Sequence, residues 1–130
     1  MSSASLSPLP APFDRLLSDV PDVATVYDEH IDDYGEVIPH VLMADVARQF
    51  NERLVASTGT GQEAGDATAF VTAVLASLEA SVADADGGVK EVVSASFLEN
   101  LEQEDDEAYD KARSLMGPML LGMLDKIEQG

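Results

Sequence analysis

The sequence predicts an all-α protein, a compact single-domain bundle of five to six helices, and three observations support this prediction. Apolar residues recur at spacings of three and four in one segment after another, which is the period of an amphipathic helix. No alternation of apolar and polar residues extends beyond a few positions, so the pattern does not indicate strands. Hydrophobic residues make up 45% of the chain but aromatic residues only 5%, so aliphatic side chains must fill the core. Such a core favours helix-on-helix packing, and 130 residues are the size of one domain.

The chain is expected to open with a flexible leader over residues 1–11, rich in Ser, Pro and Ala, before a helical domain over 12–130. A short helical patch begins that domain, carried by Phe13, Leu16 and Leu17. The next helix is expected over 21–33, because proline suits a first helical position, where its missing N–H has no partner to lose. The predicted apolar face of this second helix consists of Val23, Val26, Tyr27 and His30.

Gly35 breaks this segment, and a longer helix is expected to continue to about Ser57. Pro39 is tolerated in its first turn, where backbone N–H groups lack intrahelical partners. Its apolar series has helical spacing and consists of Val37, Ile38, Val41, Leu42, Val46, Ala47, Phe50 and Leu54. Three glycines then predict a flexible loop over 57–66, followed by a strongly apolar helix over about 66–83.

Two further helical segments are expected in the C-terminal part, one over about 88–101 and one from about 106. The acidic turn 102–107 separates them, and its last residues suit a helix N-terminus. Gly117-Pro118 is expected to kink or restart the last helix, because proline removes an interior hydrogen bond. The apolar stripe of that helix includes three methionines, Met116, Met119 and Met123.

The net charge of −18, from 25 acidic and seven basic residues, is the most unusual bulk property. Such a surface repels phosphate backbones and anionic lipids, so we expect no nucleic-acid partner and no membrane partner. A basic protein would instead be attracted and steered toward it. Plain solubility, or life in high salt, explains the same charge, and the sequence leaves these alternatives open.

Cysteine is absent, so neither disulfides nor thiolate metal sites support this fold. The N-terminus lacks the basic and apolar regions of a secretory signal. The longest apolar block, 115–124, is far shorter than the ~20 residues of a membrane-spanning helix. A soluble, cytoplasmic protein is therefore expected.

The two histidines are the first candidates for chemistry. A metal site in this part of the chain would need five possible ligands to gather, namely Glu29, His30, Asp33, Glu36 and His40. No second Glu-x-x-His pattern occurs to complete a site of the kind found in helical bundles. The alternative is that both histidines are partly buried, hydrogen-bonded and help to fix the turn. We therefore predict no metal and no cofactor.

Motifs for covalent catalysis and phosphate binding are missing. The chain has no Gly-x-Ser-x-Gly elbow, and neither GxxxxGK[ST] nor GxGxxG occurs. No serine is near a histidine in the sequence, although pairing of distant residues in the fold stays open. We expect a protein that is not an enzyme.

Two acidic clusters are the candidate binding surface. The first cluster is Asp28, Glu29, Asp32 and Asp33, with Tyr34 beside it as a possible interface anchor. The second cluster consists of Glu99, Glu102, Glu104, Asp105, Asp106 and Glu107. Runs of carboxylates commonly form solvated faces. The functional interpretation is a docking surface for arginine and lysine side chains, although the sequence alone does not place the two clusters together.

Three blocks of this chain resemble a family of small, uncharacterised bacterial proteins with a domain of unknown function. They are "YDEHIDDYGEVIPHVLMADVARQF", "VVSASFLENLEQ" and "LMGPMLLGML", and the resemblance covers roughly 22–124. The matching positions are His30, Gly35, Glu36, Pro39, His40, Ser96, Phe97, Leu98, Glu99, Asn100, Gly117 and Pro118. The resemblance implies that Asn100 or Glu99 bonds His40 where the two blocks meet, which makes His40 structural. It also implies a protein similar to the immunity proteins that neutralise bacterial toxins.

The leading hypothesis is an acidic immunity protein that occludes the active site of a cognate toxin or binds another basic protein. Its partner-binding residues would be Asp28, Glu29, Asp32, Asp33, Tyr34, Glu102, Glu104, Asp105 and Asp106. One alternative is an adaptor or regulatory subunit that uses the methionine-rich stripe, because methionine adapts to varied partners. A metalloenzyme with a His–carboxylate site is the third possibility.

Overall fold

The computed structural model describes residues 10–84 and 87–129, and that part of the chain is all-α. It contains seven α-helices and two short 3₁₀ helices rather than five to six helices, and no strand. The elements are α1 (Phe13–Asp19), η2 (Pro21–Val23), α2 (Ala24–Tyr34), α3 (Pro39–Ser57), α4 (Gly61–Asp84), α5 (Gly87–Ser96), η3 (Leu98–Asn100), α6 (Asp106–Leu115) and α7 (Pro118–Gln129). The expected leader lies outside the described residues, apart from Pro10 and Ala11.

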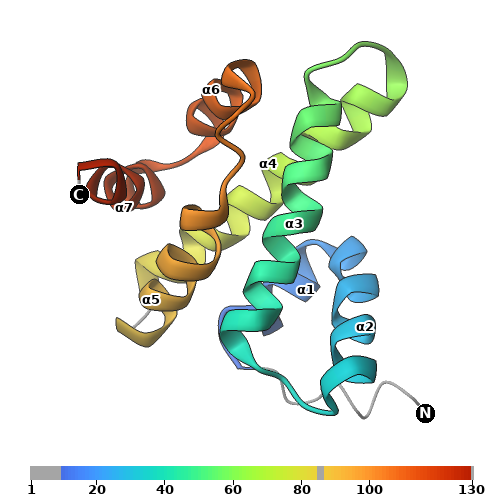
Figure 1. Cartoon of the computed structure of the whole chain (residues 1–130), viewed down its shortest axis with the longest axis vertical. Helices are drawn as coiled ribbons and strands as arrows, with labels where there is room; N and C mark the ends of the chain where they lie inside the picture. Colours follow the sequence, from blue (N-terminus) through green and yellow to red (C-terminus); the bar gives the residue numbers. More distant parts are fainter. Residues whose placement is uncertain (1–9, 85–86, 130) are drawn as a thin grey trace.

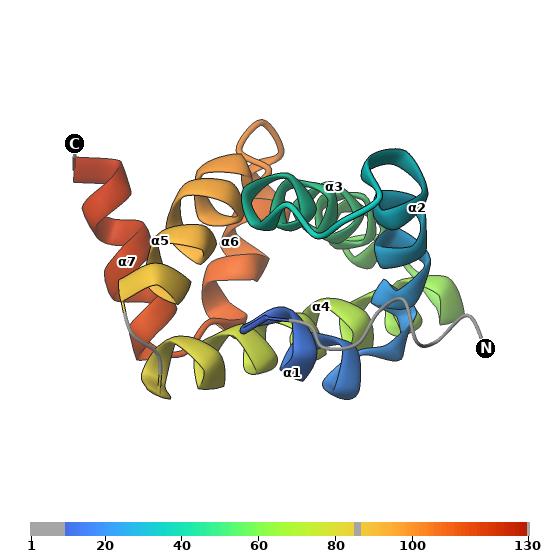
Figure 2. The ribbon, with the colours of Figure 1, turned by 90° about the horizontal axis from the view of Figure 1, so that it is seen from below.

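The two longest helices, α3 and α4, form the centre of the fold (Figure 1). A short connection turns the chain back between them, and α2 lies on one side of α3 while α5 and α7 lie on the other (Figure 2). Phe50 of α3 and Phe97 after α5 meet edge to face with ring centroids 5.0 Å apart. Burial of the aliphatic and aromatic side chains in the core supplies most of the driving force for folding.

The N-terminal helices are tied together by one buried side chain. Tyr27 of α2 is buried, and its hydroxyl donates a 2.9 Å hydrogen bond to the backbone oxygen of Phe13 in α1. Val23, Tyr27 and His30 are all buried, which confirms that these three belong to the inward face predicted for this segment. Gly35 ends α2 with a positive φ of 75°, a conformation that glycine adopts without a steric cost.

The chain restarts as a new helix at Gly117-Pro118, one of the two outcomes predicted for this dipeptide. The N-terminus of α7 is capped from α4, because the Glu79 carboxylate accepts hydrogen bonds from the backbone N–H groups of Met119 and Leu120 at 2.8 and 3.0 Å. A Cβ at Gly117 would lie 2.5 Å from Cδ of Glu79. The cap therefore requires glycine at this position.

The loop expected over 57–66 is much shorter in the structure, because α4 already begins at Gly61. Ala64 and Ala67 are buried and continue the apolar face one turn upstream, while Gly65 faces solvent. Packing of the small alanines therefore outweighs the weak helix propensity of the glycines. The helix expected over 88–101 is also shorter, since α5 ends at Ser96 and a 3₁₀ turn follows.

By length and composition alone, the stretch Gly61–Ala83 of α4 is apolar enough to cross a membrane. Half of its most apolar window is buried inside the protein. This helix is thus one of the two central helices of the bundle, which is consistent with a soluble protein. The block 115–124, which looked longest in the sequence, is divided between α6 and α7.

Candidate functional site

The first acidic cluster projects from α2 into solvent. Its four carboxylates, Asp28, Glu29, Asp32 and Asp33, are all exposed. Tyr34 ends the helix and is 49% exposed, more than any other large hydrophobic side chain among the described residues. The Tyr34 ring lies 4.9 Å from the ring of His30, which is 1% exposed, so one face of the tyrosine rests on a fixed neighbour. An aromatic side chain held in this way suits an interface anchor.

His30 fixes the turn between α2 and α3. Its Nε2 accepts a 3.0 Å hydrogen bond from the backbone N–H of Ile38, so Nε2 carries no proton and the neutral ring is protonated at Nδ1. Nδ1 lies 3.6 Å from a carboxylate oxygen of Asp45. This geometry fits the structural interpretation of His30 that the sequence left open.

The second acidic cluster is partly engaged in local backbone bonds. One carboxylate oxygen of Glu102 accepts hydrogen bonds from the N–H groups of Glu104 and Asp105. Asp105 caps α6 by accepting from the N–H of Ala108, and Asp106 lies in the first turn, where negative charge is favourable. Glu99, Glu104 and Glu107 point to solvent. Local structure therefore accounts for much of this cluster.

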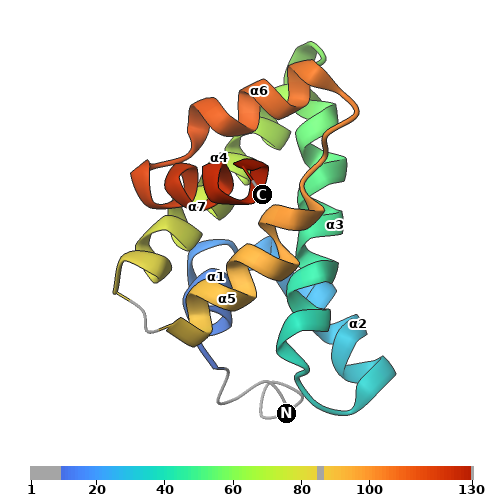
Figure 3. The same cartoon turned by 60° about the vertical axis from the view of Figure 1, so that its left-hand side comes forward.

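The fold places the two clusters at opposite ends of α3. His30 of α2 contacts the beginning of α3 through Ile38 and Asp45, whereas Lys111 of α6 donates to the backbone oxygen of Ser57 at its end. Figure 3 shows the same arrangement, with α2 beside one end of α3 and α6 beside the other. The clusters therefore flank α3 and do not merge into one patch.

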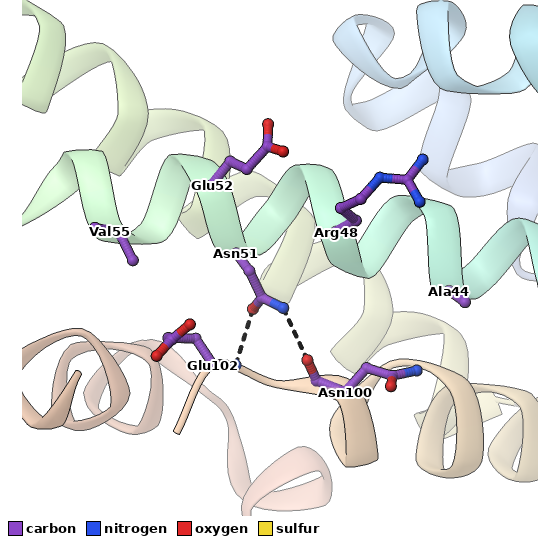
Figure 4. A pocket seen from close by; sticks show the side chains of 7 residues that line it. All are labelled: Ala44, Arg48, Asn51, Glu52, Val55, Asn100 and Glu102. Atoms are coloured by element: carbon purple, nitrogen blue, oxygen red, sulfur yellow. Dashed lines mark hydrogen bonds between the residues drawn. The ribbon is translucent and has the colours of Figure 1, made fainter. Parts of the chain in front are cut away.

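A groove that the sequence did not reveal lies between α3 and the segment 100–102, beside the second cluster. Its volume is about 600 Å³, and it is lined by Ala44, Arg48, Asn51, Glu52, Val55, Asn100 and Glu102. Asn51 points across it, donating to the backbone oxygen of Asn100 at 2.8 Å and accepting from the N–H of Glu102 at 3.0 Å (Figure 4). The helical spacing 44, 48, 51, 55 was present in the sequence, but its polar members gave no sign that this face borders a groove.

Ion pairing leaves the first cluster uncompensated. The salt bridges to acidic side chains in the described part of the chain join Arg48 to Asp45, Arg53 to Asp22, and Arg113 to Asp125 and Glu128. None of them involves a carboxylate of the first cluster. Lys111 is occupied by Ser57 and Thr68.

His40 pairs with a serine from far along the chain. Its Nδ1 lies 2.7 Å from Oγ of Ser96, at the end of α5, so the expectation of a bond from Asn100 or Glu99 is wrong. The helix ends earlier than expected, and Asn100 instead donates to the backbone oxygen of Ser96. No carboxylate among the described residues pairs with the His40 ring. The pair therefore joins α3 to α5 without the third group that would orient a catalytic histidine.

The structure also shows where the possible metal ligands and the methionine stripe lie. Within residues 10–84 and 87–129, no three His, Asp or Glu side chains are grouped so that they could hold a metal ion. Met116 is buried, and Met119 and Met123 are half-buried against the core.

Comparisons with known proteins place the chain in a family. No curated protein and no solved structure matches it. The family described as "Domain of unknown function (DUF7674)" matches residues 13–130, which include every helix from α1 to the end of α7. The chain therefore belongs to the DUF7674 family, a domain of unknown function.

Proposed function

We propose that this protein is an acidic binding protein whose first cluster and Tyr34 dock onto a positively charged partner. The observation that carries the proposal is the unfavourable placement of the carboxylates on α2. Asp32 and Asp33 lie in the last turn, where the helix dipole disfavours negative charge by about 0.3–1 kcal/mol each. Asp28 and Glu29 precede them by four residues, so each pair adds a like-charge repulsion.

A basic partner relieves this repulsion. Because none of the observed salt bridges reaches the cluster, its charge is available for arginine and lysine side chains of another protein. Tyr34 adds an apolar contact that is already oriented by His30. Long-range attraction to a net charge of −18 speeds association with such a partner.

In its specific form, the proposal is that the protein acts as an immunity protein in the bacterial cytoplasm. It would neutralise a cognate toxin by covering a basic active-site cleft with the carboxylates of α2 and of the segment 102–106. Fast, charge-steered binding suits an inhibitor that must act before the toxin does. The adaptor alternative receives no comparable support, because the three methionines are buried or half-buried.

Co-expression with the products of neighbouring genes tests this proposal. Each product is expressed in a bacterial host with and without this chain, and survival is measured together with binding of the purified proteins. The test variant combines Asp28→Asn, Asp32→Asn and Asp33→Asn. The matched control combines Glu63→Gln, Glu91→Gln and Asp110→Asn, which are exposed and remove the same charge from α4, α5 and α6.

We expect one neighbouring product to be toxic, the wild type and the control to protect the host, and the test variant to lose protection. If the test variant protects the host as well as the control does, the remaining net charge is sufficient for protection and α2 is not the docking surface. Absence of any toxic or bound product would remove the immunity function.

A further inference from the structure

The groove between α3 and the segment 100–102 has a polar wall whose hydrogen bonds are already satisfied. Asn51 uses both its amide nitrogen and its amide oxygen on the backbone of Asn100 and Glu102. The opposite wall of the groove is therefore tied to α3. What remains for a ligand is apolar surface and charge.

The apolar surface on α3 comes from Ala44 and Val55, at the two ends of a seam of groove-lining residues. Ala44, Arg48, Asn51 and Val55 recur at spacings of four, three and four, and Val55 is 41% exposed. Figure 4 shows Ala44, Asn51 and Val55 along the edge of α3 nearest the 100–102 segment. This seam spans about 17 Å at 1.5 Å per residue, the length of three helical turns. Small Ala44 at one end allows close approach, and Val55 at the other offers an apolar contact.

The charge of the groove selects the occupant. Two negatively charged residues, Glu52 and Glu102, and one positively charged residue, Arg48, line the groove. Arg48 already pairs with Asp45 at 3.3 Å. The groove therefore repels phosphates and other anions, and it repels a second copy of this −18 chain. Basic side chains on either side of a small apolar stripe complement it.

We propose that the groove binds an amphipathic helix of the partner, with lysines or arginines beside an apolar stripe that packs on Val55. This inference rests on the proposed binding of a basic protein and identifies the part of that partner which docks beside α3. An amphipathic helix laid into a groove is a common mode of peptide recognition, with contacts repeating every three or four residues.

Titration of the full chain with synthetic peptides tests the groove. The probe is a helical peptide of about four turns that carries leucine and alanine at 4-3-4 spacing and lysine beside them. A peptide of the same composition in scrambled order keeps the charge and loses the stripe. Affinity is measured by calorimetry at low salt, and the binding site is mapped by NMR amide shifts.

The decisive variant is Val55→Glu, because it adds negative charge while it removes the apolar contact. Docking in the groove predicts a loss of about tenfold in affinity for the ordered peptide, whereas attraction by charge alone predicts an equal or tighter complex. Thr72→Glu, at an exposed position on α4, adds the same charge away from the groove and should leave the affinity unchanged. Val55 is exposed, so circular dichroism should show both variants folded.

The expected result is preference for the ordered peptide, weakening by Val55→Glu only, and amide shifts centred on Ala44, Asn51 and Val55. Three results would contradict docking in the groove. They are equal binding of the scrambled peptide, undiminished binding by Val55→Glu, and amide shifts confined to α2. Those results would leave the proposed function standing, because survival in the co-expression assay depends on the α2 variant. If the co-expression assay fails but the peptide still binds, the proposed immunity function is wrong and the proposed peptide site in the groove still stands.

Discussion

Tyr27 shows how one buried side chain joins two helices and makes stability depend on pH. Burial, and secondarily the negative charge of Asp14, raises the pKa of Tyr27 above its ordinary value of 10.0. The folded state therefore holds this proton at pH values where the unfolded state has released it. Below pH 10 the proton is present in both states, and as the pH rises above 10 the free energy of unfolding decreases.

Tyr27→Phe should separate this effect from the titration of other groups. At neutral pH we expect a loss of about 1 kcal/mol, because the hydrogen bond to Phe13 disappears. Above pH 10 the wild type should lose stability more steeply than the variant, by up to about 1.4 kcal/mol per pH unit. Urea unfolding at neutral pH and at several values above 10 measures the difference. Parallel pH profiles would contradict the assignment to Tyr27.

At the scale of elements, hydrogen bonds between distant parts of the chain help to position the C-terminal helices. The 24-residue α4 supplies the Glu79 carboxylate that starts α7, and Asn51 of α3 holds the segment that leads into α6. Each link joins residues about 40 to 50 positions apart. Helical periodicity predicted the helices themselves, but it contains no information about such distant partners.

Gly117→Ala should destabilise the protein because the new Cβ would displace Glu79 and break both bonds to α7. We expect a loss of about 2–3 kcal/mol, measured by thermal or urea unfolding. Gly122→Ala, on the exposed side of the same helix, meets no atom within 4 Å and should instead stabilise by about 0.5–1 kcal/mol. Equal effects of the two substitutions would show that Glu79 moves away freely.

Asn51→Ala should loosen the wall of the groove. It leaves the backbone oxygen of Asn100 and the N–H of Glu102 without their partner, at a cost of about 1–3 kcal/mol. Amide hydrogen exchange should increase across residues 100–105, and the neighbouring substitution Glu52→Ala should leave it unchanged. Exchange that stays slow in Asn51→Ala would mean that other contacts hold this segment.

At the scale of the whole molecule, net charge opposes the compact state. Eighteen uncompensated negative charges repel one another, and salt shortens the range of that repulsion from about 30 Å at 0.01 M to about 3 Å at 1 M. In the proposed function, the same charge would steer a basic partner toward the protein. Stability and the proposed binding would therefore make opposite demands on α2.

Added sodium chloride should raise the melting temperature of the wild type, most steeply at low concentration. The variant that combines Asp28→Asn, Asp32→Asn and Asp33→Asn should melt higher at low salt and gain less from added salt, because it lacks the repulsion within α2. Differential scanning calorimetry at matched pH measures both quantities. A melting temperature independent of salt would show that the acidic surface does not strain the fold.

The sequence by itself determined the all-α class, the approximate positions of most helices and much of the inward face of α2 and α3. These properties depend on local periodicity and on punctuation by residues such as Gly35 and Pro118, which act within one or two turns. It also identified the acidic residues of α2 as a candidate surface, a prediction that the co-expression assay still has to test.

Only the tertiary structure decided that α4 starts at Gly61, that His40 meets Ser96, and that a groove lies between α3 and the segment 100–102. The early start of α4 depends on alanines packing against other helices, and the histidine pair joins residues 56 positions apart. The groove exists because Asn51 holds a distant segment beside α3. Contacts between residues far apart in the chain fix all three, and no local pattern encodes them.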